Sequence, residues 1–481
     1  MPIVTPFIDL TAVAPEIVLS VFACLLLFAS VCMKNHGAAA NTWLAITGVI
    51  VAGWYAFCPV TAHSAFTGMY EADKFAQIFK IIILLGTGLT ILISSKYSED
   101  EKINHGEYYA LLLFATVGML LMVASSDMIT LFLGLELLSI CLYVLAGYTR
   151  TRAESNEAAL KYFLLGGFAA GFLLYGMAMI YGSTGHTDLA GIGKAVSHGA
   201  FNKMYLTVGA IMLLVGLGFK LAAVPFHQWT PDVYQGSPIP ITAFMSAGPK
   251  AAVLAALIRV YEGSVSYMHV DWLAWLGVLA VMTMTVGNVA ALVQNDVKRM
   301  LAFSSISHAG YAMVGLAAAN KQGIASVIIY MLVYTLMNIA AFGVLALVAR
   351  KNEQRTKMQD FAGFAYSNPF LAIAMTILAF SLAGIPPMAG FMAKFYVFMS
   401  AMQAGLYWLV VAAVINSAIG IYYYLRFTVS MYMREPEEKL PPVTASPALL
   451  IAIVVSLIGV LVIGVVPADY LDMAGRAILS F

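Results

Sequence analysis

Six ionisable side chains lie inside long apolar stretches of this chain, where such groups are rare: Glu136, Lys161, Lys220, Lys250, His308 and Lys394. A charge at the centre of a bilayer costs about 3 kcal/mol on insertion scales, so these groups normally face a protein interior or water and act there. A buried lysine loses proton affinity, and a nearby carboxylate restores it. A lysine and a glutamate that separate and re-form could therefore load and release a proton.

Lys250 and Lys394 are the clearest candidates for proton carriers, because neither can easily reach a membrane surface. Lys250 lies in the middle of the apolar segment 241–261, and Lys394 follows a Gly/Pro interruption in the segment 369–402. The four lysines outnumber the single glutamate, whereas a purely structural network would pair its charges more evenly. We therefore expect a proton relay rather than several separate ion pairs.

The other candidates each have a structural alternative. Glu136 is expected to modulate Lys220, although the two could instead form a static ion pair that holds two helices together. Lys161 lies near a helix end, where its long side chain could reach the surface. His308 follows three serines and suits a proton relay between the two halves of the chain, but it could also be a neutral histidine bonded to a backbone carbonyl.

Two further basic residues inside apolar stretches, Lys80 and Arg259, are expected to have no such role. Both lie close enough to predicted helix ends for the charged group to extend to the membrane surface while the aliphatic stem stays buried. They are therefore left out of the candidate site.

The composition is that of a membrane protein and excludes several other classes. Hydrophobic residues make up 62% of the 481 positions and charged residues 10%, and the mean hydropathy is +0.88. The 25 basic and 24 acidic residues leave no basic surface for nucleic acid. Four scattered cysteines have no C-x-x-C spacing, and neither glycine-rich nucleotide motif is present. We expect no metal site and no cofactor site in this chain, so any redox chemistry belongs to its partners.

A spanning helix needs about 20 mainly apolar residues, because its backbone must be satisfied internally in lipid. The sequence predicts an all-α integral membrane protein with 14 such segments: 17–32, 43–58, 75–94, 109–124, 128–148, 158–181, 204–226, 241–261, 272–293, 300–318, 324–348, 369–402, 407–431 and 447–466. The first 15 residues contain no Lys or Arg, which is atypical of a cleaved signal peptide.

Lys and Arg are retained on the cytoplasmic side of membrane proteins. One set of alternate loops carries fourteen of them: Lys34, Lys96, Lys102, Arg150, Arg152, Lys298, Arg299, Arg350, Lys351, Arg355, Lys357, Arg426, Arg434 and Lys439. The opposite set carries five: Lys74, Lys194, Lys203, Lys321 and Arg476. This asymmetry predicts that both termini lie outside the cytoplasm.

Two predicted helices are interrupted, and their positions indicate an internal repeat. The twelfth contains Gly384 followed by Pro386 and Pro387, and the seventh runs through two glycines to Pro225. Interrupted helices at matching places in two halves are typical of transporters built from inverted repeats. We expect helices 1–3 at 1–107 on the periphery, a first repeat of helices 4–8 at 108–262, a second of helices 9–13 at 270–435, and helix 14 with the C-terminus at 436–481.

The chain resembles the antiporter-like, proton-conducting membrane subunits of respiratory complex I, and most closely the N-type. The resemblance covers nearly the whole length, and four stretches carry it most specifically: GLGFK at 216–220, VPFHQWTPDVY at 224–234, KRMLAFSSISH at 298–308 and SLAGIP at 381–386. It implies 14 helices with two inverted five-helix repeats. The M-type typically has a glutamate where Lys394 stands, and the L-type has a long C-terminal lateral helix for which no room remains after position 466.

The resemblance also implies roles for the candidate residues. Glu136, Lys161 and Lys220 would form an input module, Lys250 would be the central carrier with His308 towards the second half, and Lys394 would be the outlet. The protein would be a subunit of a proton-translocating NADH:quinone oxidoreductase, with the order and direction of the proton steps taken from the family.

The expected setting follows from the same resemblance. FMN, iron–sulfur clusters and quinone would belong to partner subunits. The neighbours would be an M-type subunit on one side and small K-, J- or A-type subunits on the other, in the inner (plasma) membrane of a bacterium with both termini periplasmic. Two alternatives remain open: a subunit of a multi-subunit cation/proton antiporter, which shares the core motifs, and a scaffold that only completes a complex.

Overall fold

The computed structural model describes residues 10–32, 38–58, 64–263, 272–349, 353–435 and 445–478. Within them the chain is a helical bundle with one two-stranded hairpin, in which Ser64–Ala65 (β1) pairs antiparallel with Tyr70–Glu71 (β2). Its first seven helices are α1 Ala14–Cys32, α2 Ala38–Phe57, α3 Lys74–Asp100, α4 Gly106–Ala124, α5 Met128–Ala146, α6 Ala153–Thr184 and α7 Leu189–Ser197.

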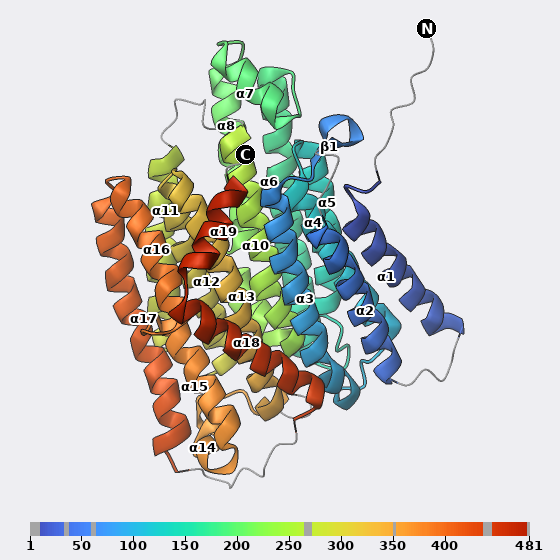
Figure 1. The fold of residues 1–481 in the computed structure, drawn as a ribbon, viewed down its shortest axis with the longest axis vertical. Coiled ribbons are helices and arrows are strands. Elements are labelled where there is room, and N and C mark those ends of the chain that lie inside the picture. The colour runs from blue at the N-terminus through green and yellow to red at the C-terminus, as the bar shows by residue number, and fades with distance from the viewer. Residues whose placement is uncertain are drawn as a thin grey trace.

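The remaining helices complete the bundle (Figure 1). They are α8 Lys203–Leu221, α9 Trp229–Gly236, α10 Ile239–Gly263, α11 Trp272–Leu292, α12 Val297–Ala317, α13 Lys321–Ala349, α14 Phe364–Ser367, α15 Pro369–Ala383, α16 Ala389–Gln403, α17 Tyr407–Met433, α18 Pro447–Val465 and α19 Ala468–Ile478. In the described residues, 13 helices are long and apolar enough to span a membrane. The predicted twelfth segment is the pair α15 and α16, so the fourteen expected segments are all accounted for.

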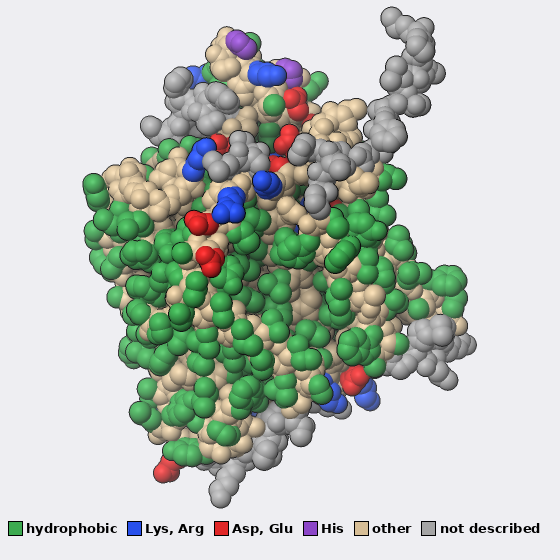
Figure 2. Space-filling model, viewed as in Figure 1, with side chains coloured by type: hydrophobic (Ala, Val, Ile, Leu, Met, Phe, Trp, Pro, Cys, Tyr) green, Lys and Arg blue, Asp and Glu red, His purple; other side chains and the backbone are tan. Residues whose placement is uncertain are grey.

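The surface has the distribution of side chains that a bilayer requires. Figure 2 shows a broad hydrophobic belt around the middle of the visible face, with charged side chains gathered towards its two ends. Figure 1 places the start of α1 and the end of α19 towards the same end of the bundle. An even number of crossings requires this arrangement of the two ends.

The interior is formed by α10, α12 and α13. The spanning windows of α10 and α12 are completely buried and that of α13 is 83% buried, whereas those of α1, α6 and α17 are about one-third buried. Of the three N-terminal helices, α3 packs against both α10 and α13, while α1 and α2 cover the outside of α3 and α4. The helices that carry Lys250 and His308 are therefore the ones furthest from lipid.

Both predicted helix breaks are present. Helix α8 ends at Leu221 and α15 ends at Ala383, and in each case the next residue leaves the helix in the left-handed conformation, with φ of +62° at Ala222 and +86° at Gly384. Prolines follow, and they cannot continue a helix because they lack the backbone N–H. The chain resumes as α9 after the first break and as α16 after the second.

A hydrogen-bonded corner connects α5 with the chain that leaves α6. Asp127 caps the N-terminus of α5 and pairs in an antiparallel bridge with Asp188. The backbone N–H of Met128 donates to the carbonyl of Thr187 at 3.0 Å, and the Thr187 hydroxyl donates to the Asp127 carboxylate at 2.6 Å. This corner lies just before α7.

The same corner recurs between α12 and the chain that leaves α13. Asp296 caps α12 and pairs with Lys357, the Val297 N–H donates to the carbonyl of Thr356 at 2.7 Å, and the Thr356 hydroxyl donates to Asp296 at 2.5 Å. Figure 1 places α7 at one end of the bundle and α14, which follows the second corner, at the other. Equal corners at opposite ends are what an inverted repeat produces, and the predicted repeat is present.

The predicted division of the chain into 1–107, 108–262, 270–435 and 436–481 stays a prediction. Its boundaries fall partly in 264–271 and 436–444, outside the described residues. The same holds for four of the basic loop residues that indicated orientation, Lys34, Arg350, Lys351 and Lys439.

Candidate functional site

Lys250 is buried near the middle of α10 and faces α12. Its Nζ lies 2.6 Å from the carbonyl oxygen and 2.6 Å from the hydroxyl oxygen of Ser305. Only 2% of Lys250 is exposed, so the structure keeps an ionisable group in the interior with neutral oxygen acceptors.

His308 lies one turn beyond Ser305 on α12 and has a partner at each ring nitrogen. Nδ1 lies 2.7 Å from the hydroxyl of Tyr330 on α13, and Nε2 lies 3.3 Å from the hydroxyl of Tyr424 on α17. The Tyr424 hydroxyl also hydrogen-bonds Ser304. A histidine bonded to two hydroxyls can accept a proton at one nitrogen and release one at the other. The ring also interacts with the backbone carbonyl of Leu382, so the alternative of a histidine held by a backbone carbonyl stays open.

Lys394 lies on α16, immediately after the second break, and its ammonium reaches back across that break. Nζ donates to the carbonyls of Leu382 at 3.1 Å and Ala383 at 3.0 Å, and to the hydroxyl of Ser417 at 3.2 Å. Those carbonyls end α15, where unpaired C=O groups and the helix dipole favour a cation. Nζ also lies 4.7 Å from the ring centroid of Tyr311.

Helix α12 joins these groups into one row. Ser305, His308 and Tyr311 follow one another at intervals of three residues, and Ser304 lies four residues before His308, which places all four towards one face of the helix. Lys250 meets this face at Ser305 and Lys394 meets it at the Tyr311 ring. The predicted site residues Lys250, His308 and Lys394 are therefore brought together along α12.

Lys220 and Glu136 form a separate group in the first half. Lys220 is buried, with its Nζ 4.9 Å from the ring centroids of both Tyr143 and Tyr162 and 3.5 Å from the Tyr143 hydroxyl. Within the described residues Lys220 has no ion pair with Glu136, and one carboxylate oxygen of Glu136, Oε1, is buried without a hydrogen-bond partner. The two charges still act on each other electrostatically. A static ion pair between helices is thus not what the structure contains.

Lys161 differs from the other three lysines because 40% of its side chain is exposed. Its Nζ lies 2.6 Å from Glu157 and 2.7 Å from Asp232, and Asp232 in turn lies 2.7 Å from Arg299 of α12. Burial alone would raise the pKa of Asp232, but the hydrogen bonds from Lys161 and Arg299 outweigh it and hold that pKa below its usual range. Lys161 therefore belongs to a partly exposed ion network that spans the two halves.

The expectation that Lys80 and Arg259 extend to the membrane surface is wrong. Both are only 4% exposed. Lys80 forms a buried ion pair with Glu16 at 2.8 Å. Arg259 pairs with Asp73 at 2.7 Å and donates to the carbonyl of Val123 at 2.6 Å. The sequence does not reveal these partners, because each comes from a segment distant along the chain.

Sequence reasoning also missed a buried carboxylate, Glu353, and took its partners Arg152 and Lys298 for loop residues. Lys298 is 1% exposed, and its Nζ lies 2.6 Å from Glu353 Oε2. Glu353 sits in a charged stretch that resembles an ordinary loop, so no local signal marks it. Tyr330 and Tyr424 were missed for a similar reason, since buried tyrosines are common in any helical core.

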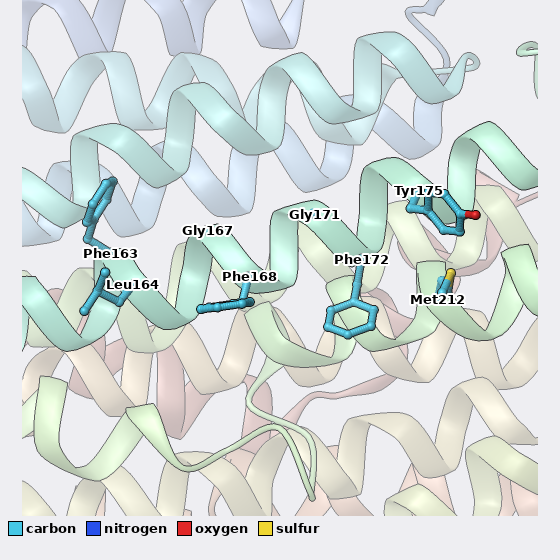
Figure 3. Close-up of a pocket in the computed structure, with 8 residues that line it drawn as sticks. All are labelled: Phe163, Leu164, Gly167, Phe168, Gly171, Phe172, Tyr175 and Met212. Atoms are coloured by element: carbon cyan, nitrogen blue, oxygen red, sulfur yellow. The ribbon is translucent and has the colours of Figure 1, made fainter.

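A groove on the outer surface of the bundle is unrelated to these polar groups. It has a volume of about 510 Å³ and is lined by α6 side chains with Met212 of α8. Figure 3 shows Phe163, Phe168 and Phe172 along it, beside Gly167 and Gly171. The lining carries no charged group, so proton chemistry does not belong there. In the part of the chain that the structure describes, no cluster of His, Cys, Asp or Glu could hold a metal ion.

Comparison with known proteins identifies the family. Residues 125–420 match the family described as "NADH:quinone oxidoreductase/Mrp antiporter, TM". A protein of Trichlorobacter lovleyi named NADH-quinone oxidoreductase subunit N is 49% identical over 98% of this chain and 97% of its own length. The chain belongs to the subunit N family of NADH-quinone oxidoreductases. The resemblance to N-type subunits that the sequence motifs indicated is thereby confirmed.

Other members and structures agree with this assignment. The subunit N of Chloroflexus aggregans is 44% identical over 98% of both chains. A chain in respiratory complex I from Thermus thermophilus has 34% identity and a TM-score of 0.82, covering 96% of this chain and 99% of that one. A chain of the Mrp complex from Dietzia sp. shares the fold, with a TM-score of 0.79 at 22% identity.

Proposed function

We propose that this chain moves protons across the membrane as a subunit of an NADH-quinone oxidoreductase. The observation that carries the proposal is the polar row on α12, where three buried groups lie along one helix face. Lys250 bonds the Ser305 hydroxyl, His308 bonds the Tyr424 hydroxyl, which also bonds Ser304, and Lys394 lies over the Tyr311 ring. The names of the relatives support the redox complex as its setting.

The residues suggest how a proton could move in the second half. Lys250 can bind a proton while Ser305 accepts hydrogen bonds from its ammonium. His308 and the hydroxyls of Tyr424 and Tyr330 can pass a proton onward along α12. Lys394 can receive it where the end of α15 stabilises a cation. Lys250 on α10 and Lys394 on α16 both contact α12, and two buried ammonium groups in one row repel each other, so loading Lys250 favours release from Lys394.

The first half supplies the input in this proposal. Lys220 rests on two tyrosine rings, and Glu136 lies near enough to influence it without pairing. Movement of the Lys220 ammonium towards the carboxylate would raise its proton affinity, and movement away would lower it. Lys161 would act at the partly exposed end of this module through Asp232.

The electron chemistry belongs to other subunits in this proposal. FMN and iron–sulfur clusters would carry electrons from NADH to quinone there, and reduction of quinone would change the electrostatics at Glu136 and Lys220. An M-type subunit would adjoin one side and small K-, J- or A-type subunits the other. The membrane would be a bacterial inner membrane, with both termini on the periplasmic side.

The test uses the whole complex purified from native membranes. Mass spectrometry should find iron–sulfur subunits with this chain, and the complex in liposomes should acidify or alkalinise the lumen when NADH and quinone are added. Lys250→Met should lower the ratio of protons moved to electrons transferred. Lys194→Met, which removes an exposed lysine of α7, should leave the ratio unchanged.

Two outcomes would contradict the proposal. A Lys250→Met complex that assembles and pumps at the normal ratio would leave this chain as a scaffold. Purification without iron–sulfur subunits, together with exchange of Na⁺ for protons in liposomes, would assign it to a cation/proton antiporter. The subunit composition of the purified complex shows whether Lys250→Met assembles. If it does not assemble, His308→Gln tests the same polar row on α12.

A further inference from the structure

Glu353 has a backbone conformation that its side chain does not favour and a side chain that is almost completely buried. Its φ is +51°, in the left-handed region of backbone conformation. This conformation is unfavourable for residues other than glycine. The side chain is 1% exposed. Such a conformation persists only where surrounding contacts stabilise it. The contacts of the Glu353 carboxylate are the candidates for this stabilisation.

Four groups from different parts of the chain meet this carboxylate. Lys298 Nζ lies 2.6 Å and Arg152 Nη1 lies 3.0 Å from Oε2, while the backbone N–H of Ile239 donates to Oε1 at 2.8 Å and the Tyr97 hydroxyl donates to the same oxygen. Burial alone would raise the pKa of Glu353, but the charges of Lys298 and Arg152 outweigh it and hold the pKa below its usual range. Glu353 is therefore ionised, and its charge is compensated.

These contacts fix one end of the helices that carry the polar row. Ile239 is the first residue of α10, eleven positions before Lys250, which is about 16 Å along the helix. Lys298 is the second residue of α12, seven positions before Ser305, or about 10 Å. One carboxylate thus holds the starts of both helices whose side chains meet at the contact between Lys250 and Ser305.

The cluster of Glu353, Lys298 and Arg152 also contacts the chain that follows the first helix break. Lys298 Nζ also donates to the carbonyls of Gln235 at 2.8 Å and Ser237 at 2.7 Å, where α9 ends. Arg152 directly precedes α6, which carries Lys161 and Tyr162. Elements of both repeats therefore share one ionic contact at this end of the bundle.

We infer that Glu353 is a positioning residue for the proton row: its carboxylate, through Lys298 and Ile239, sets how α10 and α12 lie against each other and so the contact between Lys250 and Ser305. The inference rests on the proposed proton translocation. The cluster itself does not carry protons in this proposal, and it acts only through the helices that it holds.

The experiment compares Glu353→Gln with Glu353→Asp in the purified complex in liposomes. Glu353→Gln leaves Lys298 and Arg152 facing a neutral group, and the ratio of protons moved to electrons transferred should fall at least twofold while NADH oxidation continues. Glu353→Asp keeps the charge and should restore part of the ratio. Glu99→Gln, an exposed carboxylate on α3 near Tyr97, is the matched control and should change nothing.

The outcomes separate this inference from the proposed function. A normal ratio in Glu353→Gln, with a lowered ratio in Lys250→Met, would overturn the positioning role and leave proton translocation in place. Normal ratios in both variants would overturn the proposed function itself. If Glu353→Gln fails to assemble, Lys298→Gln tests the same contact from α12, and a normal ratio there would also overturn the inference.

Discussion

Lys250 and Ser305 meet through two hydrogen bonds, since the lysine Nζ lies 2.6 Å from both the carbonyl and the hydroxyl oxygen of the serine. Ser305→Ala removes one acceptor and keeps the other. A hydrogen bond to a charged group contributes about 1.5 kcal/mol or more, which is roughly tenfold in rate. Ser305→Ala should therefore slow proton translocation by about tenfold, measured as the initial rate of pH change in liposomes.

Ser197→Ala is the control for that comparison, because its hydroxyl is exposed and bonds a nearby carbonyl of α7. Ser197→Ala should pump at the normal rate. Equal rates for Ser305→Ala and the unchanged chain would mean that the hydroxyl does not contribute to holding the Lys250 ammonium.

The contact of Ser305 with Lys250 could not be predicted from the residues around Ser305. The repeat does explain the position of Ser305, because it matches a position in the first half. Asp127 and Asp296 are 169 positions apart and occupy equal corners, and the same offset places Ser305 where the first half has Glu136. The fold repeats while the chemistry at the matching place differs. The positions of the two helix breaks indicate the repeated fold, but the contact of Ser305 with Lys250 depends on packing between two helices.

Gly384 is expected to matter for two separable reasons. Its φ of +86° is unfavourable for alanine, and a Cβ would lie 3.0 Å from Cδ of Lys394. Gly384→Ala should destabilise the protein by about 1 kcal/mol or more through the backbone and should also displace the Lys394 ammonium from the end of α15. We expect a lower melting temperature and slower proton translocation.

Gly405→Ala separates the two effects. Gly405 has a similar φ of +75°, but no neighbouring atom lies within 4 Å of the position that a Cβ would occupy, so alanine brings only the backbone strain. Gly405→Ala should lower the melting temperature without slowing translocation. Equal slowing in both variants would show that strain alone, and not the position of Lys394, is responsible.

Sequence reasoning located several of the interior charges, missed Glu353, and misjudged how others are satisfied. The breaks and the positions of Lys250 and Lys394 follow from local composition, because proline, glycine and long apolar runs have direct structural consequences. Lys80, Arg259 and Lys298 were assigned to a membrane surface or a loop, yet each is buried against a carboxylate from another segment. Such partners are set by tertiary packing, which periodicity does not encode.

The pKa of Asp232 gives a prediction with a definite sign. That pKa is lowered in the folded protein, so the carboxylate stabilises the fold above its unfolded pKa of about 4, and this contribution is lost as the pH falls through the lower folded value. Asp232→Asn should therefore reduce the melting temperature by a constant amount between about pH 6 and 8. The difference should shrink only below about pH 4; a difference that already shrinks near neutral pH would contradict the lowered pKa.

The buried ion pair between Glu16 and Lys80 should matter for stability and not for proton transfer. Glu16 Oε1 lies 2.8 Å from Lys80 Nζ and accepts a hydrogen bond from Tyr70 at 2.7 Å, and the exposed fraction of each charged side chain is 5%. Removing one partner of a buried pair costs about 3–5 kcal/mol, because the other charge is left unpaired. Glu16→Gln should therefore lower the melting temperature markedly, and Glu16→Gln with Lys80→Met should recover part of the loss.

Asp100→Asn is the matched control for Glu16→Gln, because it breaks an ion pair with Lys96 in which both side chains are about half exposed. Exposed pairs of this kind contribute about 0.3–0.5 kcal/mol, so the melting temperature should change little. The ratio of protons moved to electrons transferred should stay normal in Glu16→Gln, since none of its contacts reaches the row on α12. A lowered ratio in a complex of normal composition would place the Glu16 and Lys80 pair among the groups that move protons, and the role of α1 and α3 would then extend beyond packing.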